Sequence, residues 1–297
     1  MAKGIVLYNP LAGGGKCAED AQLVQFALDD DLEYYDMTRI TNYSAFLSGL
    51  DKEDYIVLVG GDGTLNRFIN DTDGIEIPQD ILYFPTGTGN DFAKELGKAP
   101  LCNPFPIKQY LQSLPSVQVK GKTYRFLNGI GFGIDGYCCE VGDELRKIPN
   151  KKVNYTMIAI KGLLFHFDAR NAKVTVDGKE YEYKKVWIAP TMHGKMYGGG
   201  MIPTPGQDRL NPDKTLSLMV FYGGGRLRTL CAFPGIFKGT HVKHKDMIAL
   251  HTGHEITVEF DRPTPLQIDG ETILGVTSYT ARSAIYAVQK PKERAYV

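Results

Sequence analysis

The sequence predicts two domains of different class: an α/β domain with a parallel sheet, then a domain built mostly from antiparallel β-strands. Up to about residue 115, short and continuously apolar runs alternate with helical stretches, which is the pattern of a parallel sheet covered on both faces. Beyond that point, strand-like runs dominate, several of them with alternating polarity. A chain of 297 residues has room for two such domains.

The first domain is expected to cover residues 1–120. Its apolar runs are only four or five residues long and end at glycine or proline turns, which favours buried strands over helices. The stretches between them carry apolar residues near the helical period. The expected strands are 5–8, 55–59 and 81–84, and the expected helices are 18–28, 65–69 and 90–96.

The second domain is expected to cover residues 121–282. Asp177-Gly178 lies between two alternating runs and predicts a tight hairpin turn. One helix is expected at about 151–167. The expected strands are 124–127, 173–176, 181–188, 216–222, 255–260 and 278–287.

Composition excludes several functions. Lys and Arg number 34, as do Asp and Glu, so general binding to nucleic acid is not expected. The five cysteines form no C-x-x-C pair, which disfavours a zinc ribbon or a disulfide framework. No long apolar segment opens the chain, and the longest apolar stretch, 156–167, is cut by Lys161 and too short to span a bilayer. We therefore expect a cytoplasmic protein without a transmembrane segment.

Three glycine-rich turns follow the buried strands of the first domain, at residues 9–16, 60–66 and 85–92. In open α/β sheets, ligands bind at the carboxyl ends of the strands. Glycines there let backbone N–H groups approach an oxyanion, and the next helix N-terminus adds partial positive charge. Together the turns predict a phosphate site, although each alone is also compatible with an ordinary strand-to-helix turn. Asp62 in the second turn would suit a divalent cation beside the phosphates.

Two other glycine patterns are set aside. No G-x-x-x-x-G-K-[ST] loop occurs in the sequence. Residues 131–136 fit G-x-G-x-x-G, but their β-rich context does not favour a dinucleotide site. Those glycines are expected to allow close backbone packing.

Four motifs together resemble the diacylglycerol kinase catalytic-domain family, in its bacterial lipid kinase branch. They are the Asn9-Pro10 turn, Gly-Gly-Asp-Gly-Thr-Leu-Asn at 60–66, Gly-Thr-Gly-Asn-Asp-Phe-Ala at 87–93 and Gln-Ile-Asp-Gly-Glu at 267–271. Their order and spacing also match, over most of the chain. The second motif alone is shared with NAD kinases.

The resemblance implies an α/β nucleotide-binding domain, a C-terminal β-sandwich domain and an active site in the cleft between them. It also implies that residues 283–297 return to complete the first domain. The implied ATP contacts are Asn9, Gly60, Gly61, Asp62, Gly63, Thr64, Leu65, Asn66, Thr88 and Thr38. Thr41 competes with Thr38, and either threonine could instead be an N-cap. The aspartates that match those positioning Mg²⁺ are Asp62, Asp91 and Asp135.

The resemblance assigns the catalytic carboxylate to Glu271. A carboxylate within hydrogen-bond reach of a lipid hydroxyl can take its proton as the oxygen attacks the γ-phosphorus of ATP. Asp269 lies two residues earlier, so on a strand both acids would face one side and could divide the orienting and base roles. The alternative is a hairpin turn with Asp269-Gly270 at its tip and exposed acids.

A second, structural Mg²⁺ site is implied at residues 210–216. Asp213 would be its side-chain ligand, and Leu210 and Thr215 would offer carbonyl oxygens. Lys214-Thr215 replaces the family's usual Asp-Gly or glycine-containing turn, which departs from the pattern. The alternative is a plain Asn-Pro-Asp turn.

The function expected from these features is an ATP- and Mg²⁺-dependent lipid kinase that works at the membrane surface. Diacylglycerol is the first acceptor to consider, with sphingoid bases, ceramide-like lipids and phosphatidylglycerol left open. The basic-then-apolar segment 146–165 would be an interfacial helix or a core helix. An edge strand of the first domain could pair with a copy of itself to form a homodimer. The competing functions are a catalytically weak lipid- or nucleotide-binding regulator and a soluble NAD kinase.

Overall fold

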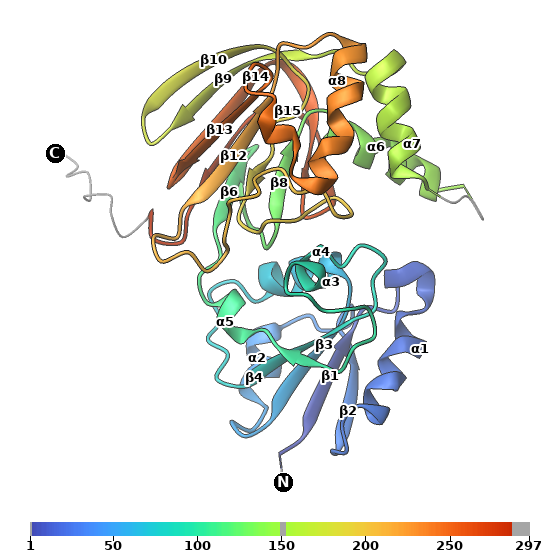
Figure 1. The fold of residues 1–297 in the computed structure, drawn as a ribbon. Coiled ribbons are helices and arrows are strands. Elements are labelled where there is room, and N and C mark those ends of the chain that lie inside the picture. Colours follow the sequence, from blue (N-terminus) through green and yellow to red (C-terminus); the bar gives the residue numbers. More distant parts are fainter. Residues whose placement is uncertain (1, 149–152, 287–297) are drawn as a thin grey trace, which may run out of the picture. The chain divides into compact units, whose positions relative to one another are not determined.

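The computed structural model describes residues 2–148 and 153–286, and its chain divides into two compact units (Figure 1). The first unit comprises Met1–Gln112 with Met196–Gly200, and the second comprises Ser113–Lys195 with Met201–Val297. The predicted return of 283–297 to the first domain falls mostly on residues 287–297, which lie outside the described residues. The domain limits expected from the sequence stay a prediction.

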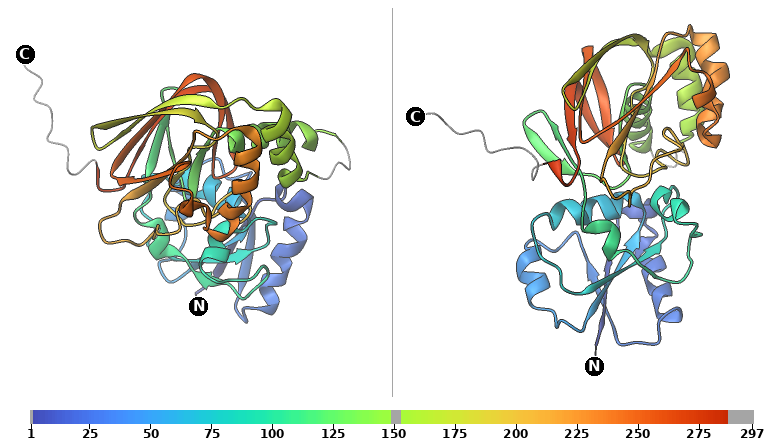
Figure 2. Two further views of the ribbon diagram at one scale, coloured as in Figure 1. Left: turned by 45° about the horizontal axis from the view of Figure 1, so that its top comes forward. Right: turned by 60° about the vertical axis from the view of Figure 1, so that its left-hand side comes forward.

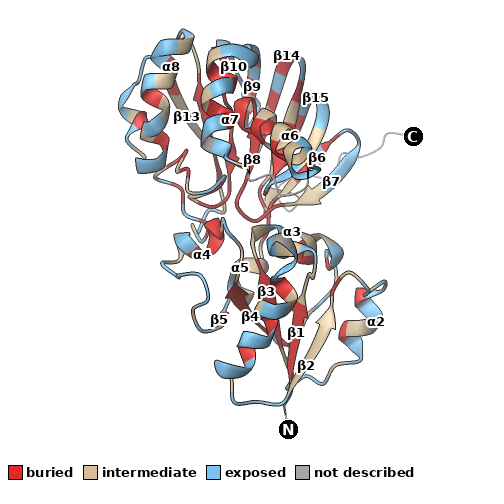
Figure 3. Cartoon of the chain, turned by 90° about the vertical axis from the view of Figure 1, so that its right-hand side faces the viewer, coloured by how far each residue is buried: buried red, intermediate tan, exposed pale blue. Residues whose placement is uncertain are grey.

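The first unit contains a five-stranded sheet in the order β2-β1-β3-β4-β5. Four strands are parallel and the short β5 is antiparallel. Valine, isoleucine and leucine fill β1 and β3, which are almost wholly buried, as the continuous apolar runs predicted (Figure 3). The strands are β1 (Gly4–Tyr8), β2 (Leu32–Asp36), β3 (Tyr55–Gly60), β4 (Asp80–Pro85) and β5 (Phe105–Pro106).

Helices cover both faces of this sheet, with α1 on one side and α2 on the other (Figure 1). Cys17, Ala21 and Val24 pack on the buried valines of β1 and β3, which explains the helical apolar pattern at 18–28. That predicted helix is in fact an α-helical turn followed by a 3₁₀ turn. The elements are η1 (Ala12–Gly15), α1 (Cys17–Ala21), η2 (Gln22–Phe26), α2 (Tyr43–Ser48), α3 (Asp62–Asp71), α4 (Asp91–Glu95) and α5 (Lys108–Leu111).

The second unit is an antiparallel β-sandwich around one apolar core. Its central strand, β14, pairs with β9 through its first half and with β8 through its last residues, so it joins both parts of the sandwich. The Asp177-Gly178 hairpin connects β9 to β10 as predicted. The strands are β6 (Ser116–Val119), β7 (Lys122–Arg125), β8 (Gly129–Phe132), β9 (Arg170–Val176), β10 (Lys179–Val186), β11 (Thr191–Met192), β12 (Leu216–Phe221), β13 (Ile248–Gly253), β14 (Glu255–Ile268) and β15 (Glu271–Arg282).

This unit also carries a layer of helices, of which the sequence predicted only one (Figure 2). The predicted helix at 151–167 is α7 (Tyr155–Lys161) and the π-helical turn η3 (Gly162–His166). The Asn154 side chain caps α7 by accepting the Met157 N–H at 3.0 Å. The others are α6 (Ile134–Arg146), α8 (Arg226–Ala232), η4 (Phe233–Lys238) and η5 (His241–Lys243). No helix among the described residues is long and apolar enough to cross a membrane.

The glycines at 131–136 serve close packing, as expected. A Cβ on Gly131 would lie 1.6 Å from a carboxylate oxygen of Asp135, and one on Gly136 would lie 2.0 Å from the Pro265 carbonyl oxygen. Strand β8 and helix α6 can therefore lie against β14 only because these positions lack side chains. The strand pairs are antiparallel, so this is not the parallel unit that binds dinucleotides.

Candidate functional site

The first unit has a ligand-binding edge at the carboxyl ends of its parallel strands. From β1 the chain passes to β2 on one side and then to β3 on the other, so the topology reverses between β1 and β3. In doubly wound sheets, ligands bind in the crevice at this reversal. The predicted turns after β1, β3 and β4 all leave the sheet at this edge.

The turns after β3 and β4 touch through their backbones. A Cβ on Gly87 would lie 2.5 Å from the Gly61 Cα, so Gly87 cannot carry a side chain at the contact, and a Cβ on Gly61 would be tight at 3.1 Å from the Gly87 Cα. Gly60 has φ 154, in the region that favours glycine, and is tightly covered by the Thr64 side chain. The ten-residue helix α3 begins immediately afterwards at Asp62. Its N-terminus and the bare glycine backbone form an anion-binding arrangement.

Asp62 ties the two turns together. One of its carboxylate oxygens accepts the Asp91 N–H at 2.8 Å, and the other accepts the Phe92 N–H at 3.0 Å. These N–H groups open helix α4, whose N-cap residue, Asn90, has a left-handed backbone and no capping hydrogen bond from its side chain. Asp62 therefore caps a helix that starts 29 residues later in the chain.

Asp91 is a buried carboxylate beside Asp62. Its Oδ2 accepts the Gly199 N–H at 2.7 Å, within the first unit, while its Oδ1 is buried without a hydrogen-bond partner among the described residues. Burial and then the charge of Asp62 raise the pKa of Asp91 to about 6. Two adjacent carboxylates, one with an unsatisfied oxygen, fit a divalent cation such as Mg²⁺, which would favour the ionised form.

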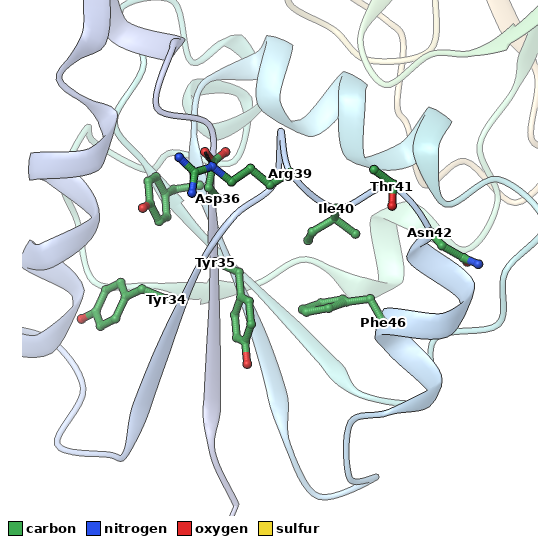
Figure 4. A pocket seen from close by; sticks show the side chains of 9 residues that line it. Tyr34, Tyr35, Asp36, Arg39, Ile40, Thr41, Asn42 and Phe46 are labelled. Carbon is green, nitrogen blue, oxygen red and sulfur yellow. Dashed lines mark ion pairs between the residues drawn. The ribbon is translucent and has the colours of Figure 1, made fainter.

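A hollow of about 470 Å³ adjoins the end of β2 (Figure 4). Asp36, Thr41 and Phe46 lie on its wall, and Arg39 pairs with Asp36 at 3.4 Å. Thr38, which the resemblance favoured, does not line the hollow but supports Asp36: its N–H and hydroxyl both donate to Asp36 Oδ1, at 2.8 and 2.6 Å. A carboxylate at the end of the second strand, next to aromatic rings, could bind a ribose and base.

In the second unit, Asp269 lies in a tight turn rather than on a strand. Ile268 pairs with Glu271, and Asp269 and Gly270 have φ values of 47° and 95°. The two acids therefore do not share a strand face, contrary to the expectation. Asp269 is buried and accepts the N–H groups of Leu127, Asn128 and Gly129, at 2.5, 2.8 and 2.9 Å. This geometry suits a residue that positions the turn, whereas Glu271 is exposed at the start of β15.

Arg209 supports the same segment from the other side, and sequence reasoning did not find it. Its buried guanidinium donates to the Leu127 carbonyl at 3.1 Å and to the Asn128 side chain at 3.0 Å. His193 lies nearby, and burial and then the charge of Arg209 lower the pKa of His193 to about 3. His193 is therefore neutral at physiological pH. An arginine in a turn-rich segment carries no signal of such a role, because its partners are more than 80 residues away.

Asp135 and Gln267 complete this part of the second unit. Gln267 accepts the Gly270 N–H at 2.7 Å and so braces the turn before Glu271. Asp135 lies in the first turn of α6. A Cβ on Gly131 would lie 1.6 Å from Asp135 Oδ2 and 2.6 Å from Gln267 Nε2, so these two side chains lie over the same glycine. The structure thus groups Asp62 with Asp91 in the first unit, and in the second it places Asp135 next to Gln267, which braces the turn between Asp269 and Glu271.

The implied structural Mg²⁺ site does not fit residues 210–216. The Thr215 carbonyl already accepts amide N–H groups from Gln207, at 3.1 Å, and from Asn211, at 3.2 Å. Lys214 holds a left-handed φ of 53°, a conformation that glycine adopts more readily. Over the described part of the chain, no group of three or more His, Cys, Asp or Glu side chains is arranged to hold a metal, so an ion here or at Asp62 and Asp91 would also need backbone, water or phosphate oxygens. The segment is therefore held by amides, and Leu210, Asp213 and Thr215 are not assigned to a metal.

The fold and these loops define a protein with a candidate phosphate-binding edge on a parallel sheet and an antiparallel β-sandwich unit. Residues 3–115 match the diacylglycerol kinase catalytic domain, and residues 128–287 match the YegS C-terminal NAD kinase beta sandwich-like domain. The chain belongs to the diacylglycerol kinase catalytic-domain family, in its bacterial lipid kinase branch.

Two individual proteins illustrate the likeness. A diacylglycerol kinase of Mycobacterium tuberculosis (strain CDC 1551 / Oshkosh) is 28% identical over 197 residues, which cover 64% of this chain and 62% of the relative. A crystal structure of a diacylglycerol kinase from Bacillus anthracis str. Sterne superposes with a TM-score of 0.64 at 23% identity. That superposition covers 95% of this chain and 94% of the other, and it shows the shared fold.

Proposed function

We propose that this protein transfers the γ-phosphoryl group of ATP to the hydroxyl group of a lipid, with diacylglycerol as the first acceptor to test. The observation that carries the proposal is the Asp62–Asp91 pair. It joins two glycine turns at the ligand-binding edge and leaves one buried carboxylate oxygen unsatisfied. A phosphate site with an adjacent cation site is what phosphoryl transfer from a nucleotide requires.

The nucleotide contacts belong to the first unit. The phosphates would lie on the backbone at 60–66 and the N-terminus of α3, with Thr88 and Asn9 on the neighbouring turns. The hollow beside Asp36 would receive the nucleoside, and its position favours Thr41 over Thr38 as the contact. Asp62 and Asp91 would hold Mg²⁺. The ion would neutralise phosphate charge as the transfer proceeds.

Glu271 would act as the general base. It takes the proton of the lipid hydroxyl while the oxygen forms a bond to the γ-phosphorus and the bond to the β,γ-bridging oxygen breaks, which releases ADP. Asp269, held by three backbone N–H groups, and Gln267 would fix the turn from which Glu271 projects. A base on a rigid turn loses little entropy in reaching the hydroxyl.

The acceptor lipid implies action at the cytoplasmic membrane surface. We propose a peripheral protein that meets its substrate there and leaves again. A homodimer remains a further part of the proposal, since β2 is a sheet edge in the first unit and could pair with a copy of itself.

The test is transfer of labelled phosphate from ATP to a panel of lipids in mixed micelles with Mg²⁺. Glu271→Gln should lower turnover by about 10²-fold or more, since the base is lost, while ATP binding stays unchanged. Glu259→Gln, an exposed acid on β14, serves as the matched control. ATP binding without transfer to any lipid would favour the regulator, and transfer to NAD would favour the NAD kinase.

A further inference from the structure

The helical layer of the second unit exposes several large apolar side chains. Phe165 on η3 is 71% exposed and Leu227 on α8 is 72% exposed. Met157 on α7 and Phe237 on η4 are also exposed. Their neighbours Ile158, Leu163 and Ile236 are buried. We name Met157, Phe165, Leu227 and Phe237 the apolar face.

One arginine holds two parts of this face together. Arg226, at the start of α8, donates to the Leu163 and Phe167 carbonyl oxygens at 2.8 and 2.9 Å, and pairs with Asp168 at 2.7 Å. Its guanidinium also lies over the Trp187 ring, 5.7 Å from the centroid. These contacts flank Phe165 and directly precede Leu227, so Arg226 ties together the two segments that carry these exposed side chains.

The same segments are strongly basic. Residues 155–168 and 226–246 contain six Lys or Arg residues against two Asp or Glu, in a chain whose formal net charge is zero. Both acids are paired with arginines, Asp168 with Arg226 and Asp246 with Arg228. Lys161, Lys238, Lys243 and Lys245 have no ion pair within the described residues. The segments that carry the apolar face, and those that directly follow them, therefore have uncompensated positive charge.

We propose that the apolar face and its surrounding lysines dock on the surface of an anionic lipid bilayer. The proposal rests on the lipid kinase function and names the surface through which that function reaches its substrate. Aromatic and aliphatic side chains enter the boundary between headgroups and acyl chains, and each nearby lysine adds attraction to anionic headgroups. A soluble protein partner would explain the apolar residues, but the excess of cations matches an anionic membrane better.

The first experiment is sedimentation of the full chain with vesicles of phosphatidylcholine, alone or mixed with phosphatidylglycerol. We expect binding to the mixed vesicles that weakens as salt is added. The double variant Phe165→Ser/Leu227→Ser should bind at least about tenfold more weakly, since two apolar groups lose their burial in lipid. The matched control is Leu250→Ser/Leu274→Ser, which alters two exposed leucines on strands of the same unit.

The second experiment places a reporter in the face. The sequence has a single tryptophan, Trp187, which is buried, so F165W adds one exposed emitter. On mixed vesicles its emission should shift to the blue and be quenched by brominated lipid. L274W should show neither change. This fluorescence measurement is independent of catalytic activity, and a folding defect in the double serine variant would not affect it.

Both proposals can fail separately. If Phe165→Ser/Leu227→Ser binds vesicles as tightly as wild type, or if F165W is not quenched, the proposed docking surface is contradicted whatever the catalytic activity. If vesicles are bound through the face but no lipid is phosphorylated, the docking surface stands and the kinase function fails. With both correct, the serine pair loses activity on vesicles yet keeps it on a short-chain diacylglycerol in detergent micelles.

Discussion

At the residue scale, the carboxylates of this protein owe their roles to the groups that surround them. Asp62 and Asp269 both accept backbone N–H groups, and so each holds a turn in place. Asp91 instead is buried with an unsatisfied oxygen, and Glu271 is exposed. These differences separate positioning groups from groups able to bind a cation or take a proton.

Asp91 predicts a specific pH dependence of stability. Its pKa is about 6 in the folded state against 3.8 as the ordinary value, so the folded state binds the proton more tightly. Stability should therefore fall as pH rises from about 4 to about 6, by up to about 3 kcal/mol, and stay level above. Asp91→Asn should remove this loss and unfold at higher denaturant than wild type at pH 8, without Mg²⁺.

The control for this prediction is Asp29→Asn, which changes an exposed acid of the same unit. Mg²⁺ should stabilise wild type at pH 8 and leave the Asp91→Asn protein unaffected. An Asp91→Asn protein that is less stable than wild type at pH 8, or that gains equally from Mg²⁺, would contradict the assignment.

Asp269→Asn should be costly for stability. The amide offers one acceptor oxygen where three N–H groups converge, and its NH₂ would face a donor. We expect a loss of about 2–4 kcal/mol in urea unfolding, together with loss of turnover. Glu271→Gln should lose turnover at unchanged stability. The positioning role fails if both variants are equally stable.

At the element scale, the two glycine turns of the first unit act as one piece because their backbones are in contact. Gly87→Ala would place a Cβ 2.5 Å from the Gly61 Cα, which is backbone and cannot give way. We expect ATP affinity to fall about tenfold or more, measured by calorimetry, with the overall fold retained. Gly206→Ala, where a Cβ meets nothing within 4 Å, is the control and should bind ATP normally.

The loop before β12 should owe its stability to Asn211 rather than to a cation. The Asn211 side chain donates to the Asp208 and Thr215 carbonyls and accepts the Thr215 N–H. Asn211→Ala should cost about 1–3 kcal/mol, while Asp213→Asn should change stability by less than about 0.5 kcal/mol with or without Mg²⁺. Thermal unfolding in EDTA and in Mg²⁺ measures both. A Mg²⁺-dependent loss in Asp213→Asn would restore the metal site.

At the scale of the whole molecule, the sequence predicted what depends on local pattern. Strands β1, β3 and β4 were predicted because both their faces are apolar. Strand β2 was missed because its five residues are all half-buried, and α6 because glycines interrupt its pattern. The partners of Arg209 and of Asp269 lie 81 to 142 residues away, so no window of sequence contains them. Side-chain roles that depend on such distant contacts can be recognised only in the folded structure.

The hydrogen bond from Gly199 to Asp91 also bears on how the protein is made. The first unit includes Met196–Gly200, so it is discontinuous along the chain. A ribosome that has synthesised Asp91 must add 108 more residues before the Gly199 N–H exists. During synthesis the sheet can form early, but the Asp91 carboxylate can accept its hydrogen bond only after Gly199 has been added. The ligand-binding edge would therefore be finished only after strands β6 to β11 of the second unit have been synthesised.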